Sequence, residues 1–273
     1  MSDEEREEEE IVCLEESFFV NNELVASCTF AMICSCTDMA RPFLRISFPH
    51  TALFFCSSYK LTSFTFGSHV LELLCLHSAS TDFDLTGQLV WPGALLMNDY
   101  LYKNADAFQN STIIELGSGV GISGILCSRF CSRVLLTDHN DEVLKILNMN
   151  IDLQVSSGNL RHCELAAEKL EWGNAEHVEK ILQKHPRGFD IMLGADICFQ
   201  QSSISLLFDT VKLLLSLQGE SCIFKLAYIS RAKTMDTLVL KEARQRGLSI
   251  QEVNGTRSVV GNHEGVIFDV LLH

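Results

Sequence analysis

The sequence predicts an α/β domain organised around a mostly parallel sheet, and three observations lead to this prediction. Ile113, Ile114 and Leu116 form a short apolar run of the kind that fits a strand buried on both faces. Gly117, Gly119 and Gly121 follow at alternate positions, and the apolar stretch 122–130 after them is typical of a helix. Strand-like and helix-like segments then alternate to the end of the chain, which is the pattern of a parallel sheet with helices on both faces.

The other elements of this domain follow in order from residue 81. A polar loop precedes a helix at 94–104, and Pro92 suits the first turn of that helix. Asn140 is placed to cap a helix that begins at Asp141. The remaining predicted strands are 134–137, 160–166, 189–195, 222–228, 248–253 and 265–272, and the remaining predicted helices are 203–217 and 234–246. The last two strands have no helix between them, so we expect the final strand to run antiparallel.

The first 80 residues are less regular than the rest. Residues 1–16 are rich in acids and are predicted to be a disordered tail. Residues 17–80 are predicted to be an N-terminal extension, in which 17–21 and 61–66 are strand-like. Between these two runs, 24–59 carry three charges and show no clear periodicity. We interpret 24–59 as an insertion, whose removal would leave the two runs as a hairpin; an extra subdomain is the alternative.

Charge and hydropathy exclude two classes of partner. The chain of 273 residues has a net charge of −14, and the first ten residues contribute seven acids and one arginine. This balance argues against non-specific binding to nucleic acid or to an anionic membrane. The longest apolar run, 24–36, has 13 residues and is too short to span a bilayer. We therefore expect neither a nucleic acid nor a membrane as partner, and we expect a monomer.

The cysteines indicate a reducing compartment. None of the eleven forms a C-x-x-C pair, and Cys34 and Cys36 lack a matching second pair, so no zinc site is predicted. The acidic N-terminus does not resemble a secretory signal. We expect reduced, mostly buried thiols in an intracellular protein. The expected location is the cytoplasm, with the nucleus left open as a second one.

The glycine turn favours a nucleotide-like ligand, and two cofactors compete for it. Gly119, Gly121 and Gly124 match the dinucleotide pattern G-x-G-x-x-G. The glycines begin earlier, however, at Gly117, shortly after the carboxylate of Glu115. S-adenosylmethionine carries an ammonium and a sulfonium, which a nearby carboxylate attracts, whereas the same carboxylate repels a pyrophosphate. A glycine turn without any ligand is the third interpretation.

Two later positions suit the ribose and the adenine of either cofactor. Asp138 ends a predicted strand about 20 residues after the glycines, where an acid accepts hydrogen bonds from ribose hydroxyls. Trp172 offers a flat ring beside the carboxylate of Glu171, which suits an adenine with its exocyclic amine. A helix-capping role for Asp138 and a packed core role for Trp172 are the alternatives, and Trp91 is open to the same doubt.

Asp196 and Phe199 lie where a transferred group would be expected. They follow the predicted strand 189–195, and ligands in open α/β sheets bind beyond the carboxyl ends of the strands. An acid there can orient an amine or take a proton from it. A lysine side chain is protonated at neutral pH and must lose that proton before it attacks a methyl group. Phe199 can wall the channel for such a side chain; an ordinary surface acid at a strand end is the alternative.

Taken together, these motifs resemble the seven-strand protein-lysine methyltransferases known as methyltransferase family 16. The resemblance covers residues 84–268. Five motifs carry it in order: Leu89-Val90-Trp91-Pro92-Gly93, Glu115 to Gly121, Asp138, Leu170-x-Trp172-Gly173, and Asp196-x-x-Phe199, which matches the family pattern Asp/Glu-x-x-Tyr/Phe. Ala227-Tyr228-x-x-Arg231 is also similar to the family. Two departures are the segment 24–59 and Glu171, which stands where Asp is commoner.

The resemblance implies a fold, a cofactor and roles for these residues. It implies a Rossmann-like sheet of seven strands with an antiparallel last strand, in a methyltransferase domain at 81–273, with S-adenosylmethionine as cofactor. The cofactor site would be lined by Trp91, Glu115, Gly117, Gly119, Gly121, Asp138, Trp172 and Ala195. Asp196 and Phe199 would meet a lysine of a protein substrate, such as a chaperone or a translation factor.

Three other functions stay open at this point. A methyltransferase that acts on a small amine, or on arginine or histidine, would share the cofactor motifs. An NAD-dependent oxidoreductase is disfavoured by Glu115 and by the absence of an evident Tyr-Lys or His-acid catalytic pair. A binding protein that keeps the fold without turnover is the third. The Asn/Asp-Pro-Pro-Tyr pattern of enzymes that methylate DNA bases or glutamine is not present.

Overall fold

The computed structural model describes residues 29–31, 59–76, 83–158, 162–218 and 222–272. The predicted acidic tail, the strand-like run 17–21 and most of the segment 24–59 lie outside the described residues. Within them, no helix is both long and apolar enough to cross a bilayer.

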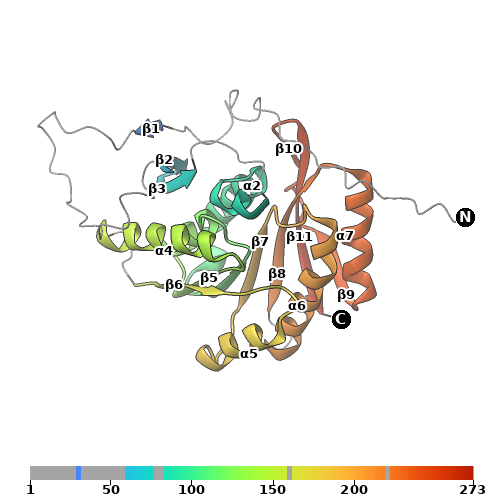
Figure 1. Ribbon diagram of the computed structural model, residues 1–273. Coiled ribbons are helices and arrows are strands. Elements are labelled where there is room, and N and C mark those ends of the chain that lie inside the picture. The colour runs from blue at the N-terminus through green and yellow to red at the C-terminus, as the bar shows by residue number, and fades with distance from the viewer. Residues whose placement is uncertain (1–28, 32–58, 77–82, 159–161, 219–221, 273) are drawn as a thin grey trace, which may run out of the picture.

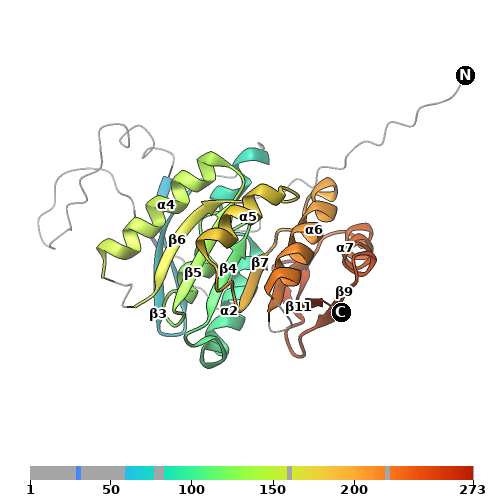
Figure 2. The ribbon, with the colours of Figure 1, turned by 90° about the horizontal axis from the view of Figure 1, so that it is seen from below.

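A central sheet of eight strands confirms the predicted fold class. Its order is β10-β11-β8-β7-β4-β5-β6, and β9 pairs with β11. Strands β4, β5, β6, β7 and β8 are parallel to one another, whereas β11 is antiparallel to both β8 and β9. Figure 2 shows β6, β5, β4 and β7 in that order across the sheet. The strands are β4 Thr112–Leu116, β5 Arg133–Asp138, β6 Glu164–Lys169, β7 Ile191–Ala195, β8 Ile223–Ser230, β9 Leu248–Glu252, β10 Ser258–Val260 and β11 His263–Leu272.

Two hydrophobic cores lie on opposite faces of this sheet, because successive side chains of a strand alternate between faces. Ile113 of β4 belongs to one core and Ile114 to the other, and Leu193 and Met192 of β7 divide in the same way. The first face is covered by α2 Pro92–Lys103, α3 Ile122–Cys127 and α4 Asp141–Ser156. The second is covered by α5 Ala175–Lys184, α6 Gln201–Gln218 and α7 Lys233–Gln245. The central strands are therefore buried on both faces, as their apolar sequences predict.

A separate three-stranded sheet packs outside the first face. It contains β1 Thr29–Ala31, β2 Tyr59–Phe66 and β3 His69–Leu76, in that order. The predicted strand 61–66 lies within β2, and its described hairpin partner is β3, reached through a turn at Gly67. Strand β1, from within the segment 24–59, pairs with Leu61 to Ser63 of β2. The insertion hypothesis for 24–59 stays a prediction.

Helix α4 lies beside this small sheet (Figure 1), and Asn150 of α4 connects the sheet to the main domain through hydrogen bonds. Its side chain accepts a hydrogen bond of 2.7 Å from the Leu74 N–H of β3 and donates one of 3.1 Å to the Leu74 carbonyl. It also donates a bond of 2.9 Å to the Val120 carbonyl in the glycine turn. Asn150 is fully buried, so one amide joins three parts of the chain without contact with water.

Six elements differ from the sequence prediction. The strand predicted at 160–166 is β6, at 164–169, and it is an edge strand with little buried surface, so its apolar signal is weak. The helix predicted at 122–130 ends at Cys127. The polar loop 81–87 contains the 3-10 turn η2 Phe83–Gln88, and a second 3-10 turn, η3 Ala105–Phe108, follows α2. Helix α5 and strand β10 were not predicted. The predicted cap at Asn140 is confirmed, since its side chain accepts from the Glu142 and Val143 N–H groups.

Candidate active site

The residues singled out in the sequence lie together at the carboxyl ends of the central strands, which we call the C-terminal edge of the sheet. The glycine turn follows β4, Asp138 ends β5, Trp172 follows β6 and Asp196 follows β7. These strands are parallel, so their carboxyl ends meet at the same edge, where open α/β sheets bind ligands. The amino end of α2, with Trp91 as its cap position, joins the same edge through contacts to Asp196.

The glycine turn is left-handed at all three predicted positions. The angle φ is 62° at Gly117, 54° at Gly119 and 88° at Gly121, a region in which a residue with a Cβ is strained. A Cβ on Gly119 would also lie 2.6 Å from the Gly87 carbonyl oxygen of η2. The turn therefore needs glycine for its own geometry. A substitution at Gly119 would disturb the turn itself, so it is a poor test of ligand binding.

Glu115 lies beneath this turn rather than in the open edge. The residue is 2% exposed, and its Oε2 accepts a hydrogen bond of 3.1 Å from the Gly124 N–H of α3. Burial raises the pKa of Glu115 to about 7, while hydrogen bonds from Gly124, Ser118 and Ser123 act in the opposite direction. Ser123 Oγ is nevertheless without a partner of full hydrogen-bond geometry. Glu115 thus holds the start of α3 through Gly124, and with a pKa of about 7 its side chain changes between the protonated and the ionised form near neutral pH.

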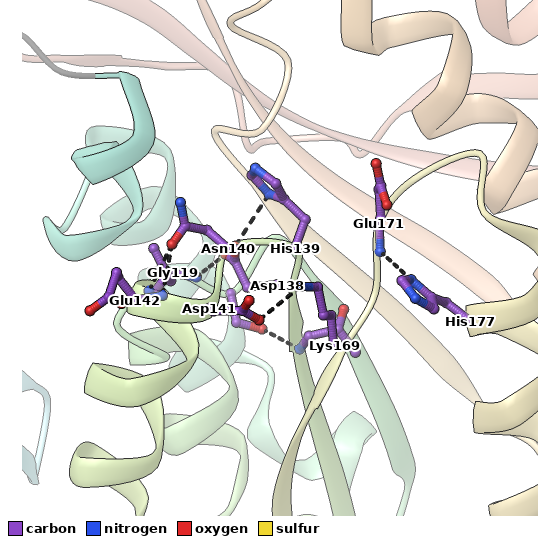
Figure 3. Close-up of polar contacts among 12 residues, drawn as sticks. Gly119, Asp138, His139, Asn140, Asp141, Glu142, Lys169, Glu171 and His177 are labelled. Atoms are coloured by element: carbon purple, nitrogen blue, oxygen red, sulfur yellow. Dashed lines mark hydrogen bonds and ion pairs between the residues drawn. The ribbon is translucent and has the colours of Figure 1, made fainter.

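Asp138 connects the ends of the first two strands of the site (Figure 3). Its buried carboxylate accepts a hydrogen bond of 3.2 Å from the Gly119 N–H at Oδ2 and one of 3.1 Å from the Asn140 N–H at Oδ1. His139 Nδ1 lies 3.4 Å from Oδ1. A carboxylate has about four acceptor positions. Asp138 therefore keeps capacity for a further donor, such as the ribose hydroxyls that the sequence predicts.

Trp172 borders the glycine turn from the side of β6. Its ring is half-buried, and a Cβ built on Gly117 would lie 3.3 Å from its Cζ2 and 2.9 Å from Ile197 Cγ2. The preceding residue, Glu171, has an exposed side chain, and its backbone N–H donates to His177 Nδ1 over 3.2 Å (Figure 3). The turn, Trp172 and the loop after β7 therefore form one continuous wall. The sequence analysis missed His177 because it missed α5.

Asp196 is held by three separate elements. It has a φ of 59°, which is uncommon for a residue with a Cβ, and it is 6% exposed. Its N–H donates to the Ala227 carbonyl of β8 over 2.9 Å. Its carboxylate Oδ2 accepts a bond of 3.0 Å from the Gly93 N–H, near the amino end of α2, and one of 2.8 Å from Arg231 Nη2; Oδ1 accepts from Arg231 Nη1. This pairing was not predicted from sequence.

Arg231 lies between Asp196 and Trp91. Its guanidinium carbon is 6.0 Å from the centroid of the Trp91 ring, and Trp91 Nε1 donates to the Thr86 carbonyl over 2.8 Å. Burial lowers the pKa of Arg231, but the hydrogen bonds and charge of Asp196 and the nearby Tyr228 outweigh it, so the pKa lies above its usual value. Arg231 is therefore a permanent cation paired with a buried acid at the centre of the edge.

Phe199 is open to solvent at the same edge. Phe199 is 47% exposed, whereas Ala195, four residues earlier at the end of β7, is half-buried. Cys198 lies between these two residues in the sequence. Burial and the charge of Asp196 raise the pKa of its thiol well above the usual value, so this cysteine stays a thiol. An exposed ring next to an edge that binds ligands is suited to contact an incoming molecule.

The described residues hold no group of three His, Cys, Asp or Glu side chains able to bind a metal. A surface hollow lined by Arg244 and by residues 247–251 lies where β9 begins, at the opposite edge of the sheet from Asp196. It brings together none of the residues discussed above.

These residues fit S-adenosylmethionine better than a dinucleotide. A backbone turn without side chains, an acid at the end of β5 and a half-buried ring after β6 suit an adenosyl group in either case. The buried acid under the turn favours a cationic tail and disfavours a pyrophosphate. The carboxyl ends of these strands can therefore hold S-adenosylmethionine at the turn and a second molecule near Phe199.

Comparison with known proteins points in the same direction. Residues 74–244 match the model of a family described as lysine methyltransferase. Protein-lysine N-methyltransferase EFM3 of Chaetomium thermophilum is 29% identical over 66% of this chain and 53% of its own length. Protein N-lysine methyltransferase METTL21A of Xenopus tropicalis is 31% identical over 58% and 66%. EEF1A lysine methyltransferase 3 of Mus musculus is 31% identical over 63% and 68%. The chain thus spans 53% to 68% of the length of these relatives.

Proposed function

We propose, from the premise that this chain belongs to the lysine methyltransferase family, that it transfers a methyl group from S-adenosylmethionine to a lysine side chain of a protein. The observation that carries the proposal is the placement of Asp196 and Phe199. They follow β7 at the edge where the glycine turn lies, and Ile197 between them packs against Gly117. An acceptor that reaches Phe199 is therefore adjacent to a molecule bound at the turn.

The bound cofactor supplies an electrophilic methyl group on a sulfonium, and the chain supplies the positions. Asp138 would accept hydrogen bonds from the ribose, and Trp172 would cover the adenine. The glycine turn, with Gly117, Gly119 and Gly121, would carry the amino-acid tail above the charge of Glu115. Trp91 and Ala195 would close the pocket on the side of the acceptor.

On the acceptor side, the chain orients an amine rather than deprotonating it. The Asp196 carboxylate already accepts from Gly93 and twice from Arg231, so about one of its acceptor positions is left. The remaining acceptor position can hold one N–H of the amine and so fix its direction. The lysine would lose its proton to water before attack and a second proton after it. Transfer then depends mainly on proximity and orientation.

A translation factor is the first acceptor to test. One relative bears the name EEF1A lysine methyltransferase 3, and the others are named as lysine methyltransferases of proteins. The aromatic ring of Phe199, exposed beside the site, suits the long side chain of a lysine on a protein surface. We further propose that the protein acts in the cytoplasm as a monomer.

Two measurements test this function. Calorimetry should show binding of S-adenosylhomocysteine and none of NADH; the reverse result would support an oxidoreductase. Tritiated S-adenosylmethionine should then label a protein in cell extract or purified EEF1A in the presence of the chain. Label in small molecules alone would move the acceptor to the small amines. Binding of S-adenosylhomocysteine with no transfer to any fraction would indicate a binding protein.

A further inference from the structure

The loop after β7 adopts a conformation that needs external support. Asp196 is one of two non-glycine residues with positive φ among the described residues, and this conformation is unfavourable for a residue with a Cβ. It nevertheless sets the direction of the three residues that follow. Ile197 turns inward against Gly117, and Phe199 emerges into solvent.

The carboxylate of Asp196 depends on Arg231. The Asp196 side chain is 2% exposed and the Arg231 side chain 13%, so both charges are largely removed from water. A buried carboxylate that loses its partner is strongly destabilised. Arg231 comes from the segment after β8 and donates to both carboxylate oxygens, a two-point contact that matches the planar fork of a guanidinium. The Gly93 N–H is the other donor, and it lies at the positive end of α2.

We infer that Arg231 is a positioning residue for methyl transfer, acting through Asp196 to fix the loop 196–199 on which cofactor and acceptor meet. The inference rests on the proposed function. Arg231 takes no part in the chemistry. Its two hydrogen bonds set the plane of the carboxylate and thereby the position of Phe199. Its cation–π contact with Trp91 extends the same arrangement to the start of α2.

The test compares Arg231→Met and Arg231→Lys with a matched control, Arg246→Met. Arg246 also pairs with a carboxylate, through Nε and Nη2 to Asp209, and its side chain is 17% exposed, but it lies at the end of α7 away from the site. Initial rates of tritium transfer from S-adenosylmethionine to extract proteins give the apparent kcat and the KM for the cofactor. Thermal melting and calorimetry with S-adenosylhomocysteine complete the comparison.

Arg231→Met should lower the apparent kcat about 100-fold, the loss expected when reacting groups are misplaced by about 1 Å. The KM for the cofactor and the affinity for S-adenosylhomocysteine should stay within about threefold of wild type. Arg231→Lys keeps the charge but loses the planar fork of the guanidinium. Its apparent kcat should lie between those of wild type and Arg231→Met. Arg246→Met should lower the melting temperature and leave kcat unchanged.

A double variant separates positioning from simple destabilisation. Arg231→Met with Asp196→Asn removes both charges, so no buried charge is left unpaired. If Arg231 acts through Asp196, the rate loss in the double variant should be smaller than the product of the two single losses. Fully multiplicative losses, or a kcat of Arg231→Met within threefold of wild type, would overturn the inference. Absence of transfer by the wild-type chain would instead overturn the proposed function, and the positioning role with it.

Discussion

Replacement of Glu115 by glutamine should change how the stability of the protein depends on pH. The carboxylate is buried under the glycine turn, and its pKa is raised from 4.5 to about 7, mainly by burial. The folded state therefore binds this proton more tightly than the unfolded state. The resulting stabilisation is complete below pH 4.5 and is lost as pH rises through 7. Glutamine keeps an oxygen for the Gly124 N–H, and the neighbouring Ser123 hydroxyl can accept from its amide.

The size of the effect follows from the two pKa values. A rise from 4.5 to about 7 corresponds to about 3 kcal/mol, since each pH unit is worth about 1.4 kcal/mol. Relative to wild type, Glu115→Gln should therefore gain about 3 kcal/mol of unfolding free energy between pH 4.5 and 8. Taking the difference between two proteins removes the contribution of all other groups that titrate in this range.

Urea unfolding at half-unit steps from pH 4.5 to 8 measures the difference directly. Glu171→Gln removes one exposed carboxylate near the same site and is a matched control for the change of charge. A stability difference between wild type and Glu115→Gln that stays constant from pH 4.5 to 8 would refute the reasoning. It would mean that the carboxylate is ionised, and satisfied, throughout.

Further predictions concern the site and the small sheet. Asp138→Ala should weaken S-adenosylhomocysteine binding by about 1.5–3 kcal/mol; calorimetric loss below about 0.5 kcal/mol would remove Asp138 from the pocket. Phe199→Ala should lower the rate of transfer to protein about tenfold with unchanged cofactor affinity, whereas equal losses in both would place the ring in the cofactor pocket. Asn150→Ala leaves three buried backbone groups unpaired and should reduce the urea-unfolding free energy by about 2–4 kcal/mol; a loss under 1 kcal/mol would contradict the fastening role. The single-turnover rate should rise from pH 6 to 9 as the acceptor lysine deprotonates, and a flat profile would speak against lysine.

The parts of the fold that sequence reasoning found are those buried on both faces. Residues 113–116 and 134–137 are apolar except for Glu115 and Thr137, because α-helices cover both sides of the sheet, so their apolar signal is nearly continuous. Strand β6 lies at the edge with mixed side chains, and its predicted position was therefore several residues early. Helix α5 has its apolar side chains on one face, at Val178, Ile181 and Leu182, so the helical spacing was present in the sequence and was overlooked.

The positions of the site residues could be predicted, but their contacts could not. Motif spacing places Asp138 and Asp196 at strand ends because parallel strands share an edge. Nothing in the spacing shows that Arg231, 35 residues later, returns to pair with Asp196. Nor does it show that Glu115 points under the turn rather than toward a ligand. Such contacts depend on the tertiary arrangement of separate elements, which a single sequence does not encode in a local pattern.

The most direct test of the central claim is to locate the transferred methyl group. The chain, S-adenosylmethionine with a labelled methyl group and either EEF1A or extract proteins are incubated together, and the labelled protein is digested and sequenced by mass spectrometry. The account predicts a mass increase on the side chain of a lysine, with Asp196→Asn giving much less label at the same residue. Label on arginine, histidine or another side chain, or equal label with and without the chain, would contradict it.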